Sequence, residues 1–596
     1  MNFFGTGELM VLGRTTVRTQ QEVRDFTDKV ITYETRDIDG MWNNRLILAG
    51  DDEYSNSYGW EGPYTHCGPC ESIADTVSNS LYSFAKVYMI SYAGNNQGIF
   101  TYPTKKPDAE AAFIRELTKG AYAGVFFGHG NTHQLADEQL FWASTDIPQI
   151  KNGRRQYLFY FGSCTVGRFD DTDHECIGEE LVRIRDGAIG TLASSCGTGP
   201  GTNTTIGKQL FNTITDTASN LTMGEHCFIA RDGSWGAKYL LLGDPATKMR
   251  MIRQGMQLTA SPESLRPLEQ LRIATDQNDH YLTAFIRDAD TIRALDSTTA
   301  YSIAGYVWRE VQTGASTYVP FGYTIDGREI YQGYWDDTAT IIVPQVSTSN
   351  DPVIKVYSHR QPRGAMIDSI GVYGSASPSS DETGPRVSLY DGGRKLTDND
   401  WVERECTLTG TVSDTSGIYL LHPTESALGF FLEINGAIDE RIDLRDYFKY
   451  DRNSQTTGEF TAQISLPEDE NTVVVNVADN VGNQTIDTLH LNVEQRGEIA
   501  IDNFLVYPNP LKDDGGLWFT FDLTSPGTAV IKVFTIAGRR IRTIENVSCQ
   551  SGYNQIYWDV RDTYMDEISN GAYLVKVTVS SGMARDEKVE KFIIAR

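Results

Sequence analysis

The sequence has few basic residues, few cysteines and no long apolar run, and each shortage excludes a class of protein. Its 596 residues include 52 Lys and Arg against 79 Asp and Glu, which makes the formal net charge -27. Nucleic-acid binding needs clustered basic residues, so we expect no nucleic-acid partner. Eight cysteines are too few for a disulfide-stabilised scaffold. Because no run of about 18 apolar residues occurs, no transmembrane segment is expected.

The first residues, MNFFGTGELMVLGR, also lack the basic start and long apolar segment of a signal peptide. Residues 5–14 instead have the character of the inside of a domain. We therefore expect the native N-terminus and its signal peptide to lie upstream of this chain.

A chain of this length is too long for one hydrophobic core, and its first 255 residues differ in pattern from the rest. Strand-like and helix-like segments alternate there, which predicts an α/β domain with a mostly parallel sheet. The expected strands are 45–49, 86–92, 122–127, 157–161 and 188–194, and the expected helices are 70–84, 108–118 and 175–185.

Beyond residue 255 the helical periods disappear and short alternating strands follow one another between turn residues. This pattern predicts about three β-sandwich domains, at 256–374, 386–498 and 501–596. The polar, proline-containing stretch 375–385 is the expected linker between the first two.

Two buried-type strands of the first domain each run into a reactive residue. YAGVFF leads to Gly128-His129-Gly130, and YLFYF leads to Gly162-Ser163-Cys164. The carboxyl ends of parallel strands share one edge of a sheet, so neighbouring strands would bring His129 and Cys164 together. An imidazole converts a thiol into the nucleophilic thiolate. A lone Cys or His is usually a packing residue, but the joint pattern favours a nucleophile, Cys164, with its general base, His129.

A thiolate attacking a carbonyl creates an oxyanion, which backbone N–H groups must stabilise. The N–H groups of Gly130 and Cys164 are the candidates, because both residues flank the reacting side chains.

Several motifs in residues 1–250 resemble the gingipain-type cysteine peptidases of family C25. Besides the two strand ends, they are VLGRTTVRTQQEVRDFTDKVITYE, SCTVGRFDDTDHECIGEELVR and LLGDPATKMR; the last two resemble the subgroup of type IX secretion sortases. The resemblance implies a caspase-like fold, with Cys164 as nucleophile and His129 as base.

The same resemblance implies a carboxylate that orients the imidazole and a loop that lines the substrate pocket. Glu71 falls where the carboxylate should lie, with Asp51 and Asp52 as competing candidates. As a helix-start acid, Glu71 has an equally simple structural explanation. The implied pocket residues are Ser194, Ser195, Cys196 and Gly197.

Two further motifs leave alternatives open. Asp170, Asp171 and Asp173 are candidate Ca²⁺ ligands, but they could equally cap the next helix. No other cofactor is required by the chemistry. Cys67-Gly68-Pro69-Cys70 has redox spacing, yet a polar stretch separates it from the preceding strand, so a local disulfide or two free thiols is the simpler interpretation. A zinc site there would need ligands beyond the nearby His66.

The C-terminal domains contain no catalytic cluster. YPNP, YWDVRD and NGAYLVKV resemble FlgD-like and type IX sorting domains, and VSDTSGIYLL with VADNVGNQTI resembles the Ig-like module beside them in the secretion sortases.

Together the resemblances imply a sortase-like cysteine endopeptidase at the cell surface, outer-membrane-associated or extracellular. Its substrates would be type IX cargo proteins carrying C-terminal sorting domains, and its partners would be outer-membrane secretion proteins. The acyl-enzyme would be resolved by water or, in transpeptidation, by a surface amine. The alternatives are a secreted gingipain-like protease that is itself cargo, and a non-catalytic adhesin or scaffold.

Overall fold

The structure is a computed structural model, and it divides the chain into two compact units. One contains Met1–Pro378 with Arg452–Gln455, and the other contains Ser379–Asp451 with Thr456–Arg596. The described residues are 11–35, 40–52, 54–55, 59–61, 65–77, 81–92, 105–171, 175–231, 236–287, 292–295, 321–325, 327–346, 348, 351–360, 362–421, 429–438, 441–493, 499–513, 515–581 and 584–596. The divide at Pro378 falls within the stretch 375–385 that the sequence marks as a linker.

The first unit begins with a six-stranded sheet in the order β10-β9-β8-β5-β1-β4. Its strands are parallel except β10, which runs antiparallel to β9. Their bounds are β1 Arg45–Gly50, β4 Ser83–Tyr88, β5 Ala123–Phe127, β8 Tyr157–Gly162, β9 Ala188–Ser194 and β10 Tyr239–Gly243. The mostly parallel α/β sheet predicted from the sequence is therefore present.

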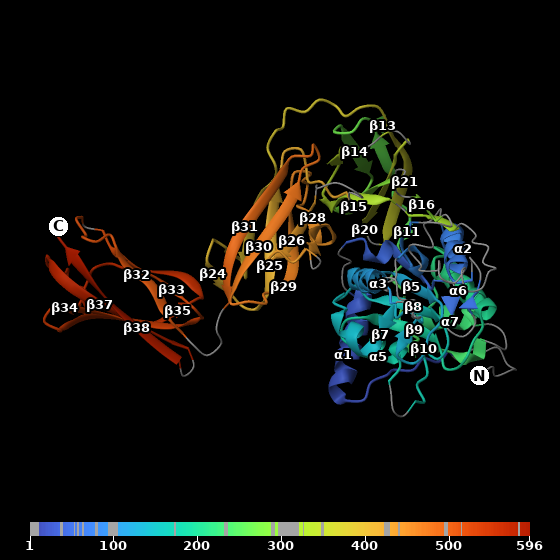
Figure 1. Ribbon diagram of the computed structural model, residues 1–596, viewed down its shortest axis with the longest axis horizontal. Helices are drawn as coiled ribbons and strands as arrows, with labels where there is room; N and C mark the ends of the chain where they lie inside the picture. The colour runs from blue at the N-terminus through green and yellow to red at the C-terminus, as the bar shows by residue number, and fades with distance from the viewer. Residues whose placement is uncertain are drawn as a thin grey trace. The chain divides into compact units, whose positions relative to one another are not determined.

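Helices cover both faces of this sheet (Figure 1), and each strand supplies side chains to both. Leu46 and Leu48 pack on the face of α2, α6 and α7, whereas Ile47 and Ala49 pack on the face of α3 and α5. Strands buried on both faces read as continuous apolar runs, which is why they are visible in the sequence. The helices are α1 Gln20–Thr35, α2 Cys67–Val77, α3 Pro107–Lys119, α4 Ala143–Asp146, α5 Ile177–Arg183, α6 Pro200–Ile214 and α7 Met223–Ala230.

One helix and the strand after it differ from the sequence prediction. The helix expected at 70–84 is α2, which begins at Cys67 and ends at Val77, and β4 already starts at Ser83. Proline is tolerated in the first helical turn, so Pro69 does not prevent the earlier start. Apolar residues continue past the end of α2 through Tyr82 and Phe84 into β4. Periodicity alone therefore did not show where the helix ends and the strand begins.

The rest of the first unit is rich in strands. One sheet has the order β11-β21-β20-β15-β18, and a smaller one has the order β12-β14-β19. The Tyr357 hydroxyl donates to the Tyr82 carbonyl at 3.0 Å, which joins these strands to the α/β region. The strands are β11 Arg253–Gln254, β12 Leu258–Ser261, β13 Ser264–Leu265, β14 Gln270–Thr275, β15 His280–Arg287, β16 Ile292–Leu295, β17 Phe321–Thr324, β18 Arg328–Trp335, β19 Ala339–Ile342, β20 Val353–Arg360 and β21 Arg363–Val372. Short strands of the α/β region are β2 Tyr54–Ser55, β3 Gly59–Trp60, β6 Gln134–Leu135 and β7 Phe141–Trp142.

In the second unit, two sheets lie between residues 386 and 493 and two more between 501 and 594. The first pair comprises β22 Arg386–Asp391, β23 Arg394–Lys395, β24 Asp400–Val402, β25 Glu405–Ser413, β26 Phe431–Ile434, β27 Ile442–Asp443, β28 Phe448–Tyr450, β29 Thr457–Ser465, β30 Glu470–Ala478 and β31 Gln484–Val493. The second pair comprises β32 Ile501–Tyr507, β33 Leu517–Leu523, β34 Gly527–Thr535, β35 Arg540–Cys549, β36 Gly552–Trp558, β37 Gly571–Ser581 and β38 Ala584–Ile594. Alternating burial along β33 and β37 places one apolar core between that second pair.

Helix α3 carries an acid, Glu110, whose charge should destabilise the α/β region at neutral pH. Burial and the negative charge of Asp146 raise the pKa of Glu110 to about 7. A carboxyl with a raised folded pKa binds more protons in the native state, so its contribution to stability falls as pH rises from about 4.5 to 7. We expect Glu110→Gln to raise the free energy of unfolding by about 1–2 kcal/mol at pH 8, a figure that is reduced for solvent screening because this group is partly exposed.

At pH 4.5 the same substitution should change the melting temperature far less, because the glutamate is then protonated in the native state and about half protonated in the unfolded state. Differential scanning fluorimetry of both proteins at the two pH values measures the effect. An equal difference at pH 4.5 and pH 8 would contradict the assignment to ionisation.

Candidate active site

His129 and Cys164 follow the carboxyl ends of adjoining parallel strands. Phe127 of β5 pairs with Gly162 of β8, and the Gly128 N–H donates to the Gly162 carbonyl at 3.5 Å. Both reactive residues line one pocket, together with Thr65, His66, Phe127, Gly128, Gly162, Thr198, Pro200 and Asn203. The juxtaposition expected from the two strand ends is therefore found.

The backbone of His129 is held by a buried carboxylate at the end of β1. The His129 N–H donates to Oδ2 of Asp51 at 2.9 Å. A Cβ at Gly128 would lie only 2.6 Å from the Asp51 Cβ, so this close approach requires glycine there. Burial raises the pKa of Asp51 to about 6. Asp51 thus holds the main chain of His129, and Asp52 pairs with Lys106 at 2.8 Å.

The carboxylate that contacts the His129 ring is Glu61. Its Oε2 lies 3.0 Å from Nε2 of His129 and 2.9 Å from Nε2 of His66. These hydrogen bonds, first from His66 and then from His129, lower the pKa of Glu61 to about 2, so the carboxylate is ionised at neutral pH. An ionised carboxylate only accepts, so Nε2 of His129 is the donor, and a neutral ring then carries its lone pair on Nδ1. That nitrogen can accept a proton from a thiol.

Glu71, the orienting acid expected from the sequence, is engaged elsewhere. Its carboxylate accepts from Lys86 Nζ at 3.0 Å and from the Tyr88 hydroxyl, both on β4. Glu71 is in the first part of α2, whereas Glu61 precedes that helix. The position expected for Glu71 is therefore filled by Glu61, which the sequence reasoning missed because no motif or periodicity marks it.

Cys164 lies at a tight turn whose shape is set by the loop after β9. The Thr198 N–H donates to the Cys164 sulfur at 3.3 Å. Thr165, the next residue, has a φ of 51°, which is rare for a β-branched residue. Its N–H donates to the Cys196 carbonyl at 3.4 Å, and the Gly167 N–H donates to the Ser194 carbonyl at 2.9 Å. Strain of this kind is tolerated where neighbouring contacts impose it, and it often accompanies a functional residue.

Those carbonyls belong to the residues expected to line the substrate pocket. Ser194, Ser195, Cys196 and Gly197 are not among the described residues that line the pocket; Thr198 of the loop after β9, and Pro200 and Asn203 of the first turn of α6, are. The predicted stretch instead supports the nucleophile turn, and Lys238 Nζ holds the Gly197 carbonyl at 2.7 Å. A direct role of Ser194, Ser195, Cys196 and Gly197 in binding substrate stays a prediction.

The start of helix α5 contacts both the loop that carries His129 and the loop that carries Cys164. The Ile177 N–H donates to the Thr132 carbonyl at 2.9 Å, and the Gly178 N–H donates to the Val166 carbonyl at 3.1 Å. Thr132 follows His129 and Val166 follows Cys164, so one helix start fixes both. The first-turn N–H groups of a helix have no partner within the helix and are available for such bonds.

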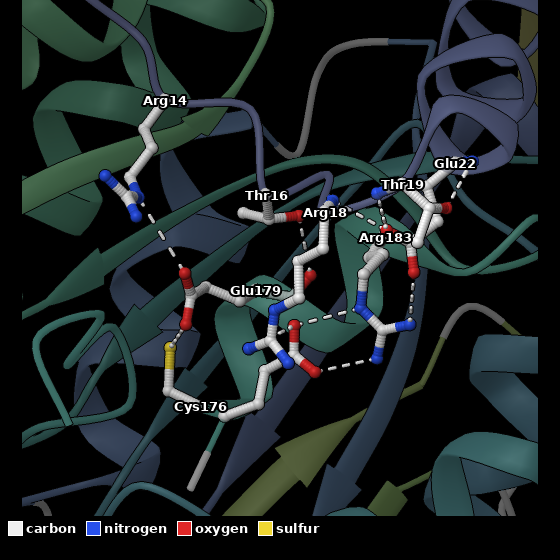
Figure 2. Close-up of polar contacts among 9 residues, drawn as sticks. Arg14, Thr16, Arg18, Thr19, Glu22, Cys176, Glu179 and Arg183 are labelled. Atoms are coloured by element: carbon white, nitrogen blue, oxygen red, sulfur yellow. Dashed lines mark hydrogen bonds and ion pairs between the residues drawn. The ribbon is translucent and has the colours of Figure 1, made fainter. Parts of the chain in front are cut away.

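A charged cluster anchors α5 to the N-terminal segment (Figure 2). Arg183 bonds Glu175 through Nε and Nη2 at 2.9 and 2.7 Å, and its Nη1 lies 3.3 Å from Glu22 of α1. Figure 2 also shows Arg14 directed at Glu179, with an ion-pair distance of 3.8 Å. The two parallel hydrogen bonds between Arg183 and Glu175 fix the orientation of that pair. Through these contacts the N-terminal segment helps to position the loops that carry His129 and Cys164.

Gly130, a candidate oxyanion donor, packs directly against the residue before the nucleophile. A Cβ there would lie 2.5 Å from Oγ of the fully buried Ser163. We expect Gly130→Ala to displace the Cys164 turn and to slow alkylation of Cys164 by a peptidyl electrophile about 100-fold, since shifts near 1 Å have effects of that size.

Gly201→Ala is the matched control, because a Cβ at Gly201 meets nothing within 4 Å. The alkylation rate of each variant, measured by intact-protein mass spectrometry, tests the expectation. Equal rates for the two variants would show that the Gly130 contact is unimportant.

The candidate Ca²⁺ ligands are only partly described. Asp170 is exposed and lies 3.7 Å from Arg168, and Asp173 is outside the described residues. Within the described part of the chain, the clusters of potential metal ligands are Glu61–His66–His129, Asp51–Asp52–Glu138 and Asp381–Asp414–Asp479. Ca²⁺ binding at Asp170, Asp171 and Asp173 therefore remains a prediction.

All eight cysteines lie in the described part of the chain and are free thiols there. Cys67 and Cys70 are buried, and their sulfurs contact the Asp51 and Ala49 carbonyls at 3.5 and 3.3 Å. Of the alternatives for this motif, the structure contains the two free thiols. None of the helices in the described part combines the length and apolar character that a membrane span requires.

Comparison with known proteins finds a family to which the α/β region is similar. The family model described as Peptidase family C25 matches residues 7–250. Residues 7–250 are therefore similar to peptidase family C25. The resemblance inferred from the strand-end motifs is confirmed, and the C25 assignment supports a cysteine peptidase. No curated protein matches the sequence.

The chain is also similar to solved structures. Dimeric latent PorU from Porphyromonas gingivalis is 20% identical, with 65% of this chain and 39% of that chain covered and a TM-score of 0.24. The Arg-specific cysteine proteinase gingipain R is 14% identical, with 61% and 75% covered and a TM-score of 0.33. The complex of Porphyromonas gingivalis RgpB pro- and mature domains is 15% identical, with 61% and 77% covered and a TM-score of 0.34. This chain thus spans about 39% of the PorU chain.

Proposed function

We propose that the C25 region is a cysteine endopeptidase in which Cys164 is the nucleophile, His129 the general base and Glu61 the residue that orients the base. One observation carries the proposal: His129 and Cys164 follow adjoining strand ends and line the same pocket, while Glu61 holds Nε2 of His129 at 3.0 Å. A nucleophile, a base and a group that orients the base form the arrangement that acyl transfer needs.

The reaction follows from these contacts. Nδ1 of His129 takes the Cys164 proton, and the thiolate attacks the peptide carbonyl to form a tetrahedral intermediate. The N–H groups of Gly130 and Cys164 are the proposed oxyanion donors, each of which contributes about 3 kcal/mol in enzymes of known mechanism. His129 then returns the proton to the leaving amine, which leaves an acyl group on Cys164. Water activated by the same imidazole hydrolyses the thioester.

The substrate we propose is the C-terminal sorting domain of type IX secretion cargo, cut at the cell surface or outer membrane. The motif SCTVGRFDDTDHECIGEELVR and the strand-rich C-terminal domains support this sortase-like role. A surface amine could replace water as the acceptor, which would make the second step a transpeptidation and would require partial exclusion of water from the pocket.

A second candidate is a secreted gingipain-like protease that is itself cargo. The resemblance of residues 501–596 to type IX sorting domains favours it. Cargo loses that domain during export, whereas a sortase keeps it. Mass spectrometry of the mature C-terminus in a native host therefore distinguishes the two.

Covalent labelling tests the catalytic proposal against a non-catalytic adhesin or scaffold. We expect a peptidyl acyloxymethyl ketone to label the full chain once, at Cys164, and Cys164→Ala to lose the label. Cys196→Ala should keep it, and it is the matched control because Cys196 is the exposed cysteine. Labelling that survives in Cys164→Ala, or that never occurs at Cys164, would contradict the proposal.

A further inference from the structure

Three side chains of types that can ligate a metal ion converge beside the pocket, and two of them, His66 and His129, line it. Glu61 precedes α2, His66 lies directly before that helix, and His129 follows β5. Oε2 of Glu61 lies 2.9 Å from Nε2 of His66 and 3.0 Å from Nε2 of His129, and all three atoms lie within 4.8 Å of one another. The His66 ring meets the His129 ring edge-on at 5.5 Å, which turns both Nε2 atoms towards the same oxygen.

The chemistry of these ligands selects a particular class of cation. Two imidazoles and one carboxylate suit Zn²⁺, whereas Ca²⁺ and Mg²⁺ prefer oxygen ligands alone. The other two clusters in the described part of the chain contain only carboxylates. Bonds of about 2.1 Å in tetrahedral geometry place ligand atoms about 3.4 Å apart. The Oε2–Nε2 distances of 2.9 and 3.0 Å therefore need to widen only slightly when the metal binds.

We propose that Glu61, His66 and His129 form an inhibitory site for Zn²⁺, bound by Nε2 of each histidine and by the Glu61 carboxylate. The fourth position faces the pocket and takes a water molecule. This inference rests on the proposed function, since it assigns a regulator to the same catalytic group. His66, which the peptidase reaction does not use, gains a role as the ligand that completes the site.

The inhibition follows from where the ring protons lie. Without metal, Nε2–H of His129 donates to Glu61, and the lone pair is on Nδ1. Zn²⁺ needs the lone pair of Nε2, so the proton of each neutral ring moves to Nδ1 through solvent, and no proton is released overall. His129 with a protonated Nδ1 cannot accept the Cys164 proton. Zn²⁺ thus disables the base without bonding to the thiol.

Direct metal binding tests the site without relying on activity. The full chain carrying Cys164→Ala, which removes the pocket thiol, competes for Zn²⁺ against a chromophoric chelator. We expect one strong site that excess Mg²⁺ or Ca²⁺ does not occupy. Adding His66→Gln should weaken binding more than about 100-fold, since losing even an indirect partner of a metal can cost 10–100-fold. Adding His490→Gln, at an exposed histidine far along the sequence, should change nothing.

Two further measurements keep the test decisive if His66→Gln fails to fold. Co²⁺ bound to the Cys164→Ala protein should show d–d absorption without a thiolate charge-transfer band. Zn²⁺ should also protect His129, but not His490, from carbethoxylation, as mapped by mass spectrometry. Absence of binding, equal affinity with and without His66, or a thiolate band from Cys67 and Cys70 would each overturn the inference.

Failure of this inference is distinguishable from failure of the proposed function. If the metal-free wild-type chain cleaves peptides but binds no Zn²⁺, only the metal site is contradicted. If the chain binds Zn²⁺ through His66 and His129 but cleaves no peptide, only the proposed peptidase activity is contradicted.

Discussion

Replacing Glu61 with glutamine should lower kcat by about 10²–10⁴-fold, because the orienting carboxylate of a catalytic imidazole has effects of that order. Glutamine preserves the size of the side chain but removes the charge that keeps both Nε2 atoms as donors. Its amide nitrogen would also present hydrogens to one ring and favour the tautomer with Nδ1 protonated. KM should change far less than kcat, since the peptide does not bind through this group.

Glu71→Gln is the matched control, because it makes the same chemical change ten residues along the chain. It removes the ion pair with Lys86 at 2.8 Å, so a lower melting temperature is expected with kcat changed by less than about tenfold. Steady-state kinetics on a peptide selected from a cleavage library measures both variants. A larger loss in Glu71→Gln than in Glu61→Gln would restore Glu71 as the orienting acid.

Cys164→Ala and His129→Ala should each lower kcat by about 10⁵–10⁶-fold, and the double variant should be no worse than either single one. Residues that act as one catalytic unit show this non-additivity, because removing either member removes the covalent route. The concentration of each variant is measured by absorbance and its folding by circular dichroism before the assay, because a covalent active-site titrant cannot count sites that lack Cys164 or His129.

Cys196→Ala provides the control for loss of a thiol near the pocket, and it should keep more than about a tenth of wild-type kcat, as expected for an exposed residue that does not contact the reacting atoms. Losses that multiply in the double variant would mean that Cys164 and His129 act independently. The pair would then not be a nucleophile and its base.

The strands of the α/β region were predictable because each is buried on both faces. YLFYF and AIGTLAS read as continuous apolar runs, and β8 and β9 occupy those residues. The end of α2 was not predictable, since Tyr82 and Phe84 continue the apolar pattern into β4. Local periodicity cannot show where an apolar segment changes from helix to strand when both bury the same kind of residue.

The two reacting residues were predictable for a similar reason. His129 and Cys164 each end a strong strand pattern and are flanked by glycine, so their place at one sheet edge follows from the parallel order. The role of Glu61 was not predictable, because this residue lies in an irregular segment before α2 and no periodicity assigns its side chain to a face. Thr198 lies in the loop after β9 and Asn203 in the start of α6, and their approach to the pocket depends on contacts such as that from the Thr198 N–H to Cys164.

The sequence by itself determined the places of the buried strands, the family resemblance and the candidate nucleophile and base, because these depend on apolar runs and on residues fixed to strand ends. Only the tertiary structure decided which carboxylate orients His129, which loop residues line the pocket, and that His66 shares the same oxygen. Those choices depend on distances between segments far apart in the chain. Such distances are set by packing across the whole domain, which no local pattern encodes.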